Sequence, residues 1–131
     1  MSLALSVRPE DPRPIYVQIV DEVRRAVVRG TLGPGDPLPS VRELARRLKV
    51  NPTTIQQAYR ELDHEGLVRS ERGRGTFISP EAGRGPELRR RVVHEVAAIA
   101  LREAVRAGLT TEELVRAIRE QDPTSEEETN S

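Results

Sequence analysis

Cysteine is absent from this 131-residue sequence, and aromatic residues are almost absent too, with two tyrosines, one phenylalanine and no tryptophan. A chain without cysteine cannot form disulfides, thiolate metal sites or a cysteine nucleophile, and it fits a reducing compartment such as the cytoplasm. Hydrophobic residues make up 36% of the chain. A core can therefore form, but it must be built from aliphatic side chains.

Long hydrophobic runs are also missing, since no apolar stretch approaches the roughly 20 residues that a helix needs to span a bilayer. The opening residues MSLALSV are few and lack a charged lead, so we do not expect a secretory signal peptide. The sequence therefore predicts a cytoplasmic protein with no membrane association.

The net charge is zero, with 21 basic and 21 acidic side chains. Their distribution is uneven, because residues 1–80 hold 13 basic and 10 acidic side chains whereas residues 81–131 hold 8 and 11. Affinity for nucleic acid depends on the phosphates contacted rather than on the total charge. A neutral total therefore does not exclude a DNA-binding protein, although it predicts only modest non-specific affinity.

A first helix is predicted between Pro14, which suits a helix start, and Gly30, which suits the position after a helix end. The proline- and glycine-rich residues 31–39 that follow are expected to form a rigid loop.

The segment from 40 to 66 has the pattern of two short helices joined by a tight turn. Ser40 followed by Glu43 predicts a capping box at the start of the first helix, and Asn51-Pro52 predicts the start of the second. Gly66 suits the left-handed position after its end. The apolar positions repeat at helical spacing: Val41, Leu44, Ala45 and Leu48, then Ile55, Ala58, Tyr59 and Leu62. This arrangement is typical of a helix-turn-helix.

The side of the second helix opposite its apolar stripe is polar, either uncharged or basic. It carries Thr53, Gln56, Gln57 and Arg60. Acidic residues appear only in the last turns of this helix. A surface that approaches phosphates and base edges needs such a composition. An ordinary solvated helix face would look similar, so the neighbouring segments must decide between the two interpretations.

A β-hairpin is predicted directly after the helix-turn-helix. Residues 67–68 and 76–78 suit short strands, and the glycine-rich run SERGRG between them suits a loop. A helix-turn-helix followed by a hairpin is a winged helix. The wing tip interleaves Arg72 and Arg74 with Gly73, which allows close approach of the backbone while arginine supplies charge and donors. The alternative is a turn that merely needs glycine, but the arginines favour DNA contact.

Two further helices are predicted after the hairpin, from about residue 86 to 107 and from Thr110 to about 121. Thr110 followed by Glu113 predicts a capping box at the start of the second of them. Their apolar band is wider than a lone surface helix needs, so another surface must cover it. We expect the winged helix to cover part of this band and a second copy of the chain to cover the rest, while the alternative is that both helices pack on their own domain. The expected dimerisation residues are Val92, Val96, Ile99, Leu114 and Ile118.

The predicted fold class is therefore mostly α-helical with a small β-hairpin. Residues 1–80 are expected to form a winged helix-turn-helix DNA-binding domain, and residues 81–121 a short two-helix C-terminal dimerisation element. Residues 122–131 are acidic and polar, so they are expected to form a disordered tail.

Residues 10–80 also contain a dense series of family-specific runs: PIYVQI, GTLGPGDPLPSVRELA, NPTTI, AYREL, EGL and RGRGTF. Together these runs closely resemble the DNA-binding domain of GntR-type transcriptional regulators. The short tail of two helices is similar to the YtrA-type subfamily, whose members are dimeric regulators often linked to membrane transport operons.

The resemblance implies roles for individual residues. Arg42 stands where the family has a DNA-contacting arginine, and Arg72 with Gly73 corresponds to the wing residues that enter the minor groove. The first turn of the recognition helix, which contacts bases and phosphates, corresponds to Asn51, Pro52, Thr53 and Thr54, followed by Gln56. Some relatives carry arginine at the positions of Pro52 and Gln56, so the base sequence that they read does not carry over to this chain.

These observations predict a sequence-specific DNA-binding regulator, namely a homodimeric repressor that binds an inverted-repeat operator in duplex DNA and controls a transport operon. Thr53 and Gln56 are expected to discriminate bases, while Arg42, Thr54 and Arg60 are expected to anchor phosphates. The alternative is a winged-helix module that binds protein or RNA.

Enzymatic activity is not expected. His64 and His94 are the only histidines, and neither has a partner at a metal-ligand spacing. The wing also lacks the strand, helix and lysine of a phosphate-binding loop. We therefore expect no cofactor and no metal. A small-molecule effector at the dimer interface stays open, since no residue pattern identifies one.

Overall fold

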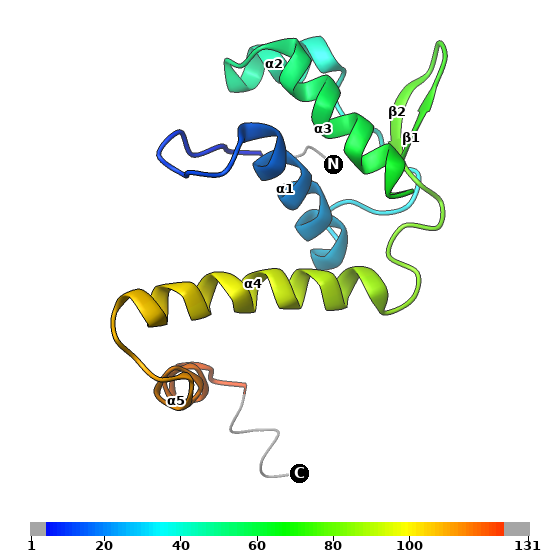
Figure 1. Cartoon of the computed structure of the whole chain (residues 1–131). Helices are drawn as coiled ribbons and strands as arrows, with labels where there is room; N and C mark the ends of the chain where they lie inside the picture. The colour runs from blue at the N-terminus through cyan, green and yellow to red at the C-terminus, as the bar shows by residue number, and fades with distance from the viewer. Residues whose placement is uncertain (1–4, 125–131) are drawn as a thin grey trace. The chain divides into compact units, whose positions relative to one another are not determined.

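The computed structural model describes residues 5–124, and its helices and hairpin are drawn in Figure 1. In chain order the elements are α1 (Ile15–Arg29), α2 (Val41–Leu48), α3 (Pro52–His64), β1 (Val68–Glu71), β2 (Gly75–Ile78), α4 (Glu87–Arg106) and α5 (Thr111–Gln121). The predicted fold class, mostly α-helical with a small hairpin, is confirmed.

Helix α1 begins directly after Pro14 and ends at Gly30, as the sequence predicts. Gly30 has a φ of 84°, a left-handed conformation that glycine adopts without steric cost. The side chains of Ile19 and Val23 on its inner face have 0% exposure. The helix therefore contributes one complete face to the core.

The side chain of Gln18 joins the segment before α1 to the helix by hydrogen bonds. Its Oε1 accepts from the Arg8 N–H at 2.8 Å, and its Nε2 donates to the carbonyls of Arg8 and Arg13 at 3.1 Å each. The Gln18 side chain is buried, and a buried amide is stabilised only when its donors and acceptors are paired. These three bonds hold the chain ahead of α1 against the domain.

Helices α2 and α3 form the expected helix-turn-helix. The Ser40 hydroxyl accepts from the Glu43 N–H at 3.1 Å, whereas the Glu43 carboxylate accepts from Arg47 Nη2 at 3.0 Å rather than from the Ser40 N–H. The expected capping box is thus replaced by a simple serine cap, because Arg47 lies one turn further along and competes for the carboxylate. The cap of α3 is Asn51, whose Oδ1 accepts from the Thr53 N–H at 2.9 Å.

Helix α3 is the central element of the domain, since it packs against α1, α2 and β1. Ile55 and Leu62 on its inner face and Leu44 on α2 are completely buried. The hydroxyl of Tyr59 donates to the Pro39 carbonyl at 2.7 Å, and burial raises the pKa of this hydroxyl. Tyr59 therefore stays neutral and fixes the proline-rich segment ahead of α2 onto α3.

The hairpin is more extensively paired than the sequence predicts. Strands β1 and β2 are antiparallel, with Val68 opposite Ile78. Residues 35–38, expected to be only a loop, lie along the other edge of β2. Three backbone hydrogen bonds of 2.8 Å join them, from Gly35 N–H to the Ile78 carbonyl, from Ile78 N–H to the Asp36 carbonyl and from Leu38 N–H to the Thr76 carbonyl. Pro37 faces Phe77 in this pairing, where an edge position suits a residue that cannot donate.

The chain divides into two compact units, residues 1–92 and residues 93–131, and the division falls inside α4. The first turns of α4 belong to the winged-helix unit. There Leu88 packs against the core, Val92 is buried, and Arg89 Nη2 donates to the Val28 carbonyl at 3.5 Å. The sequence-based boundary at residue 80 lies earlier, at the end of the hairpin.

In the second unit, α5 begins with the complete capping box that the sequence predicts. The Thr110 hydroxyl accepts from the Glu113 N–H at 3.1 Å, and the Glu113 carboxylate accepts from the Thr110 N–H at 3.0 Å. The bond from the backbone N–H of Thr110 lowers the pKa of Glu113. Of the expected disordered tail, residues 125–131 lie outside the described residues.

No helix among residues 5–124 combines the length and the apolar character that crossing a membrane requires.

Candidate nucleic-acid interface

Helix α3 presents two contrasting sides. Its inner side is buried, whereas Thr53, Gln56, Gln57 and Arg60 are all exposed. Thr54 is half-buried, and its N–H donates to the Asn51 carbonyl at 3.0 Å. The structure therefore brings the predicted reading residues together on the outer surface of one helix. Their contacts with DNA stay a prediction.

Asn51 caps helix α3 and is also a candidate DNA-binding residue. Its Oδ1 caps α3 through the Thr53 N–H, so this oxygen is already engaged in the protein. The side-chain amide still has two donors, which suit a phosphate or an acceptor on a base edge. Asn51 therefore shapes the start of the recognition helix, and its amide N–H groups are donors that it can offer to a DNA contact.

Arg42 lies in the first turn of α2 and is exposed. In the part of the chain that the structure describes, no ion pair or side-chain hydrogen bond engages its guanidinium, whereas the adjacent Glu43 pairs with Arg47. An unpaired, permanently charged fork of donors next to α3 is suited to phosphate binding.

The wing tip is a three-residue loop, Arg72 to Arg74, closed by the pairing of Glu71 with Gly75. The Arg74 N–H donates to the Glu71 carbonyl at 3.0 Å, and Gly73 has a φ of 78°. The two arginines differ in their partners. Arg74 Nη1 lies 3.5 Å from Glu71 Oε2, while Arg72 has no partner among residues 5–124. The charge of Arg72 is therefore not offset by an acidic neighbour, whereas that of Arg74 is.

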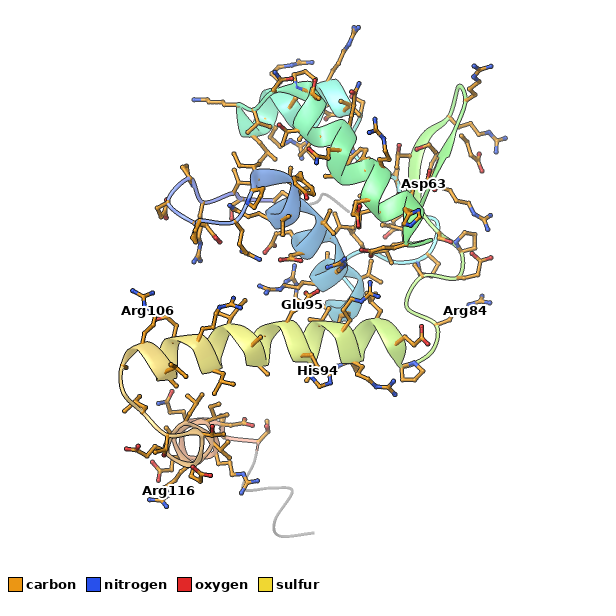
Figure 2. All side chains as sticks on the ribbon, in the orientation of Figure 1. Asp63, Arg84, His94, Glu95, Arg106 and Arg116 are labelled. Carbon is orange, nitrogen blue, oxygen red and sulfur yellow. The ribbon has the colours of Figure 1, made fainter. Side chains whose placement is uncertain are left out.

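The acidic residues of α3 gather at its C-terminal end, where Figure 2 shows Asp63. Asp63 and Glu61 are exposed, whereas Glu65 is half-buried and accepts from Arg24 on α1. The negative charges thus lie away from the first two turns of α3, and one of them is neutralised inside the fold. This distribution directs the N-terminal half of the helix, rather than its end, toward a polyanion.

The five predicted dimerisation residues differ in exposure. Val96 and Ile118 are exposed, at 48% and 52%, and Ile99 and Leu114 are half-buried. Val92 is buried within the winged-helix unit, so it offers little surface to a partner. Other apolar side chains of the second unit are also exposed, namely Val93, Leu101, Val105, Leu109 and Val115.

A polar hollow of about 190 Å³ lies within the first unit, between the end of α3, the base of the hairpin and the start of α4. Two of the three acidic residues that line it are already engaged. Glu65 pairs with Arg24 and lies 3.6 Å from Arg91, and Glu81 accepts from Ser79 and Arg69. The bond from the Ser79 hydroxyl lowers the pKa of Glu81. We interpret the hollow as part of the fold rather than as an effector site.

Two exposed basic residues, one on α2 and one in the turn after it, are not among the site residues predicted from the sequence. Arg46 lies four residues after Arg42, and Lys49 three residues later again. The spacing of four residues is visible in the sequence and places Arg42 and Arg46 on one side of α2, while Lys49 follows at the C-cap of this helix. Attention to charge along α2, and not only along α3, would have found them.

Comparison with known proteins supports the same interpretation. Residues 15–78 match the family model described as bacterial regulatory proteins, gntR family. The HTH-type transcriptional regulator YhcF of Bacillus subtilis is 43% identical over 110 residues, which cover 84% of this chain and 91% of that protein. The HTH-type transcriptional repressor YtrA of the same organism is 45% identical over 78 residues, which cover 60% of each chain.

Solved structures show the same fold. A GntR family transcriptional regulator from Listeria monocytogenes superposes with a TM-score of 0.70 at 34% identity, covering 86% of this chain and 99% of that one. The DNA-binding domain of AraR in complex with its operator ORX1 superposes with a TM-score of 0.52 at 29% identity, covering 60% of this chain and 99% of that one.

Proposed function

This chain belongs to the GntR family of bacterial regulatory proteins, and from that premise we propose that it is a homodimeric repressor of an inverted-repeat operator. Family membership makes it a DNA-binding transcriptional regulator rather than an enzyme. The observation that carries the finer proposal is the exposed polar and basic surface formed by the start of α2, the first two turns of α3 and the wing tip.

In the proposed complex the first two turns of α3 enter the major groove. Gln56 and Thr53 are exposed there and can hydrogen-bond base edges, a glutamine being suited to bidentate contact with adenine. Arg42 and Arg60 hold phosphates on either side, and Arg72 of the wing reaches the adjoining minor groove. Phosphate contacts would fix the register of the protein, while Thr53 and Gln56 would supply the specificity.

Dimerisation is supported by the second unit. No residue of α5 is buried, and the unit exposes Val105 at 67% and Val93 at 57%. Large apolar side chains exposed on adjacent helical turns mark a surface that is stabilised by covering it. We propose that a second copy of the chain covers this surface. A partner related by two-fold symmetry would also supply the second DNA-binding domain that an inverted repeat requires.

Repression would follow from occlusion of a promoter by the bound dimer. The YtrA-type resemblance supports a transport operon as the target, and an operator in bacterial DNA supports a cytoplasmic location. A reporter placed under the chain's own operator should rise when the gene is deleted. An unchanged reporter would contradict the repressor role.

Binding of labelled duplex DNA, measured by fluorescence anisotropy over a series of salt concentrations, tests the proposal. The wild-type chain should bind with an affinity that falls steeply as salt rises. The variants Arg42→Ala and Arg72→Ala should bind duplex DNA more weakly. The matched control is Arg29→Ala, which removes an exposed arginine from the end of α1.

The same titrations separate the alternative function. If the two variants bind duplex DNA as well as the wild type does, or if single-stranded RNA is preferred to the duplex, the helix-turn-helix and wing do not form the proposed operator-binding surface. A winged-helix module for RNA or protein would then be the better description.

A further inference from the structure

Lys49 occupies an unusual backbone conformation in the turn between α2 and α3. Its φ and ψ are 58° and 46°, and within residues 5–124 it is the one non-glycine residue with a positive φ. Most residues other than glycine and asparagine avoid this left-handed region, because their Cβ approaches the neighbouring carbonyl oxygen. Helix capping alone would therefore be better served by glycine at this position.

The turn itself needs the left-handed residue. The Lys49 N–H donates to the Arg46 carbonyl at 3.3 Å, and the Val50 N–H donates to the Ala45 carbonyl at 3.0 Å, which ends α2 and redirects the chain toward Asn51. These bonds involve only backbone atoms, so they do not require a lysine side chain. What lysine adds at this strained position is a positive charge.

That charge extends a row along α2. Arg42, Arg46 and Lys49 follow at intervals of four and three residues, and all three are exposed. No acidic side chain in the described part of the chain neutralises them, whereas the neighbouring Arg47 is paired with Glu43 at 3.0 Å. The row therefore presents three uncompensated positive charges, and its last member, Lys49, lies two residues before Asn51, the N-cap of α3.

We propose that Arg46 and Lys49 continue the phosphate-binding surface that begins at Arg42, so that α2 and its turn follow the DNA backbone beside the groove entered by α3. This inference rests on the proposed function. Its occupant is duplex DNA, because the row adjoins the reading helix at its positively polarised N-terminal end. Lysine acts on a phosphate as a compact point charge, which carries no base information, so these residues set affinity rather than sequence preference.

The decisive variant is Lys49→Gly, which removes the charge while relieving the backbone strain. It should melt at or above the wild-type temperature, because glycine adopts the left-handed conformation freely. It should nevertheless bind an operator and an unrelated duplex about tenfold more weakly near 0.1 M salt. The slope of log K against log salt should decrease by about 0.9, the value for one lost phosphate contact.

Arg46→Gln should behave in the same way, since it tests the same row without changing the turn. Lys49→Arg retains the charge and should retain the wild-type slope. Arg29→Gln, an exposed arginine at the end of α1, is the matched control and should leave both the affinity and the slope unchanged.

The outcomes separate this inference from the function on which it rests. If the wild type binds duplex DNA but Lys49→Gly and Arg46→Gln keep its affinity and salt slope, the inference is wrong and the operator-binding function stands. If the two variants lose affinity for the operator alone, the residues read bases and the assignment to phosphates is wrong. If the wild type itself does not bind duplex DNA, both proposals are wrong.

Discussion

The guanidinium of Arg24 on α1 donates two hydrogen bonds to the carboxylate of Glu65 at the end of α3, one of them from Nε to Oε2 at 3.1 Å. Both side chains are largely buried, at 13% and 14% exposure. Arg24 also donates to Asp21 at 3.2 Å. The end of the recognition helix is thus fixed to the helix that packs behind it.

Replacing Glu65 by Gln should destabilise the domain by about 2 kcal/mol, because it removes the carboxylate charge that is paired with the largely buried guanidinium of Arg24. Urea denaturation followed by circular dichroism measures the change. The matched control is Glu43→Gln, which removes the exposed pair with Arg47 and should cost less than about 1 kcal/mol. Equal losses in the two variants would show that burial of the Arg24–Glu65 pair contributes nothing.

Gln56→Ala should reduce operator binding by about 1–3 kcal/mol and leave binding to an unrelated duplex unchanged, since it removes a base contact and no charge. Competition titrations with both duplexes measure this difference. Gln121→Ala, the same substitution at an exposed position on α5, is the control. Parallel losses on both duplexes would mean that Gln56 does not read bases.

The two wing arginines should differ in their effect on binding. Arg72→Ala should weaken duplex binding roughly tenfold, whereas Arg74→Ala should weaken it only two- to threefold at about 0.1 M salt, because Glu71 already offsets part of the Arg74 charge. Glu71→Gln should strengthen binding, since it frees Arg74. Anisotropy titrations measure all three, and a stronger effect at Arg74 than at Arg72 would contradict this account of the wing.

Ile118→Asp should convert the proposed dimer to monomer, raising its dissociation constant at least about a hundredfold, because a charged group would replace apolar surface that the proposed partner would cover. Analytical ultracentrifugation measures the change. Figure 2 shows Arg116 on the same helix, and Arg116→Asp is the matched control because it lies almost opposite Ile118 around the helix. A chain that is monomeric before any substitution would refute the proposed dimer.

Lowering the pH should destabilise the first turn of α5 by protonating Glu113. Its pKa is lowered from 4.5 by the hydrogen bond from Thr110 N–H, so the folded state binds this proton less readily than the unfolded state does. The contribution of Glu113 is therefore present above pH 4.5 and disappears as the pH falls through the lowered pKa. An NMR titration should give a Glu113 midpoint below 4.5, and Glu113→Gln should lose this part of the pH dependence. A midpoint at or above 4.5 would contradict the capping box.

Local sequence signals predicted most of the fold. Pro14 and Gly30 bound α1, Asn51 caps α3, and Thr110 with Glu113 forms the complete box, because each of these features depends on neighbours within a few residues. Ser40 with Glu43 shows the limit of this reasoning. The same spacing gave only a serine cap, since the Glu43 carboxylate accepts a hydrogen bond from Arg47 instead.

Non-local features were not predictable in this way. Residues 35–38 pair with β2 although their sequence is rich in proline and glycine, because the geometry of the edge strand and not a strand pattern determines that pairing. The Arg24–Glu65 pair joins residues 41 positions apart, and a sequence pattern with a range of one or two turns cannot show it. The same reason explains Val92, which has the helical spacing of an interface residue but lies buried in the first unit.

Selection of bound sites from a pool of random DNA duplexes tests the central claim most directly, because it reports DNA binding, symmetry and spacing together. The account predicts enrichment of an inverted repeat whose half-sites are centred about one helical turn apart, or a multiple of it, with loss of enrichment for the Arg42→Ala variant. Enrichment of single, unpaired sites, or no enrichment at all, would contradict a dimeric operator-binding repressor.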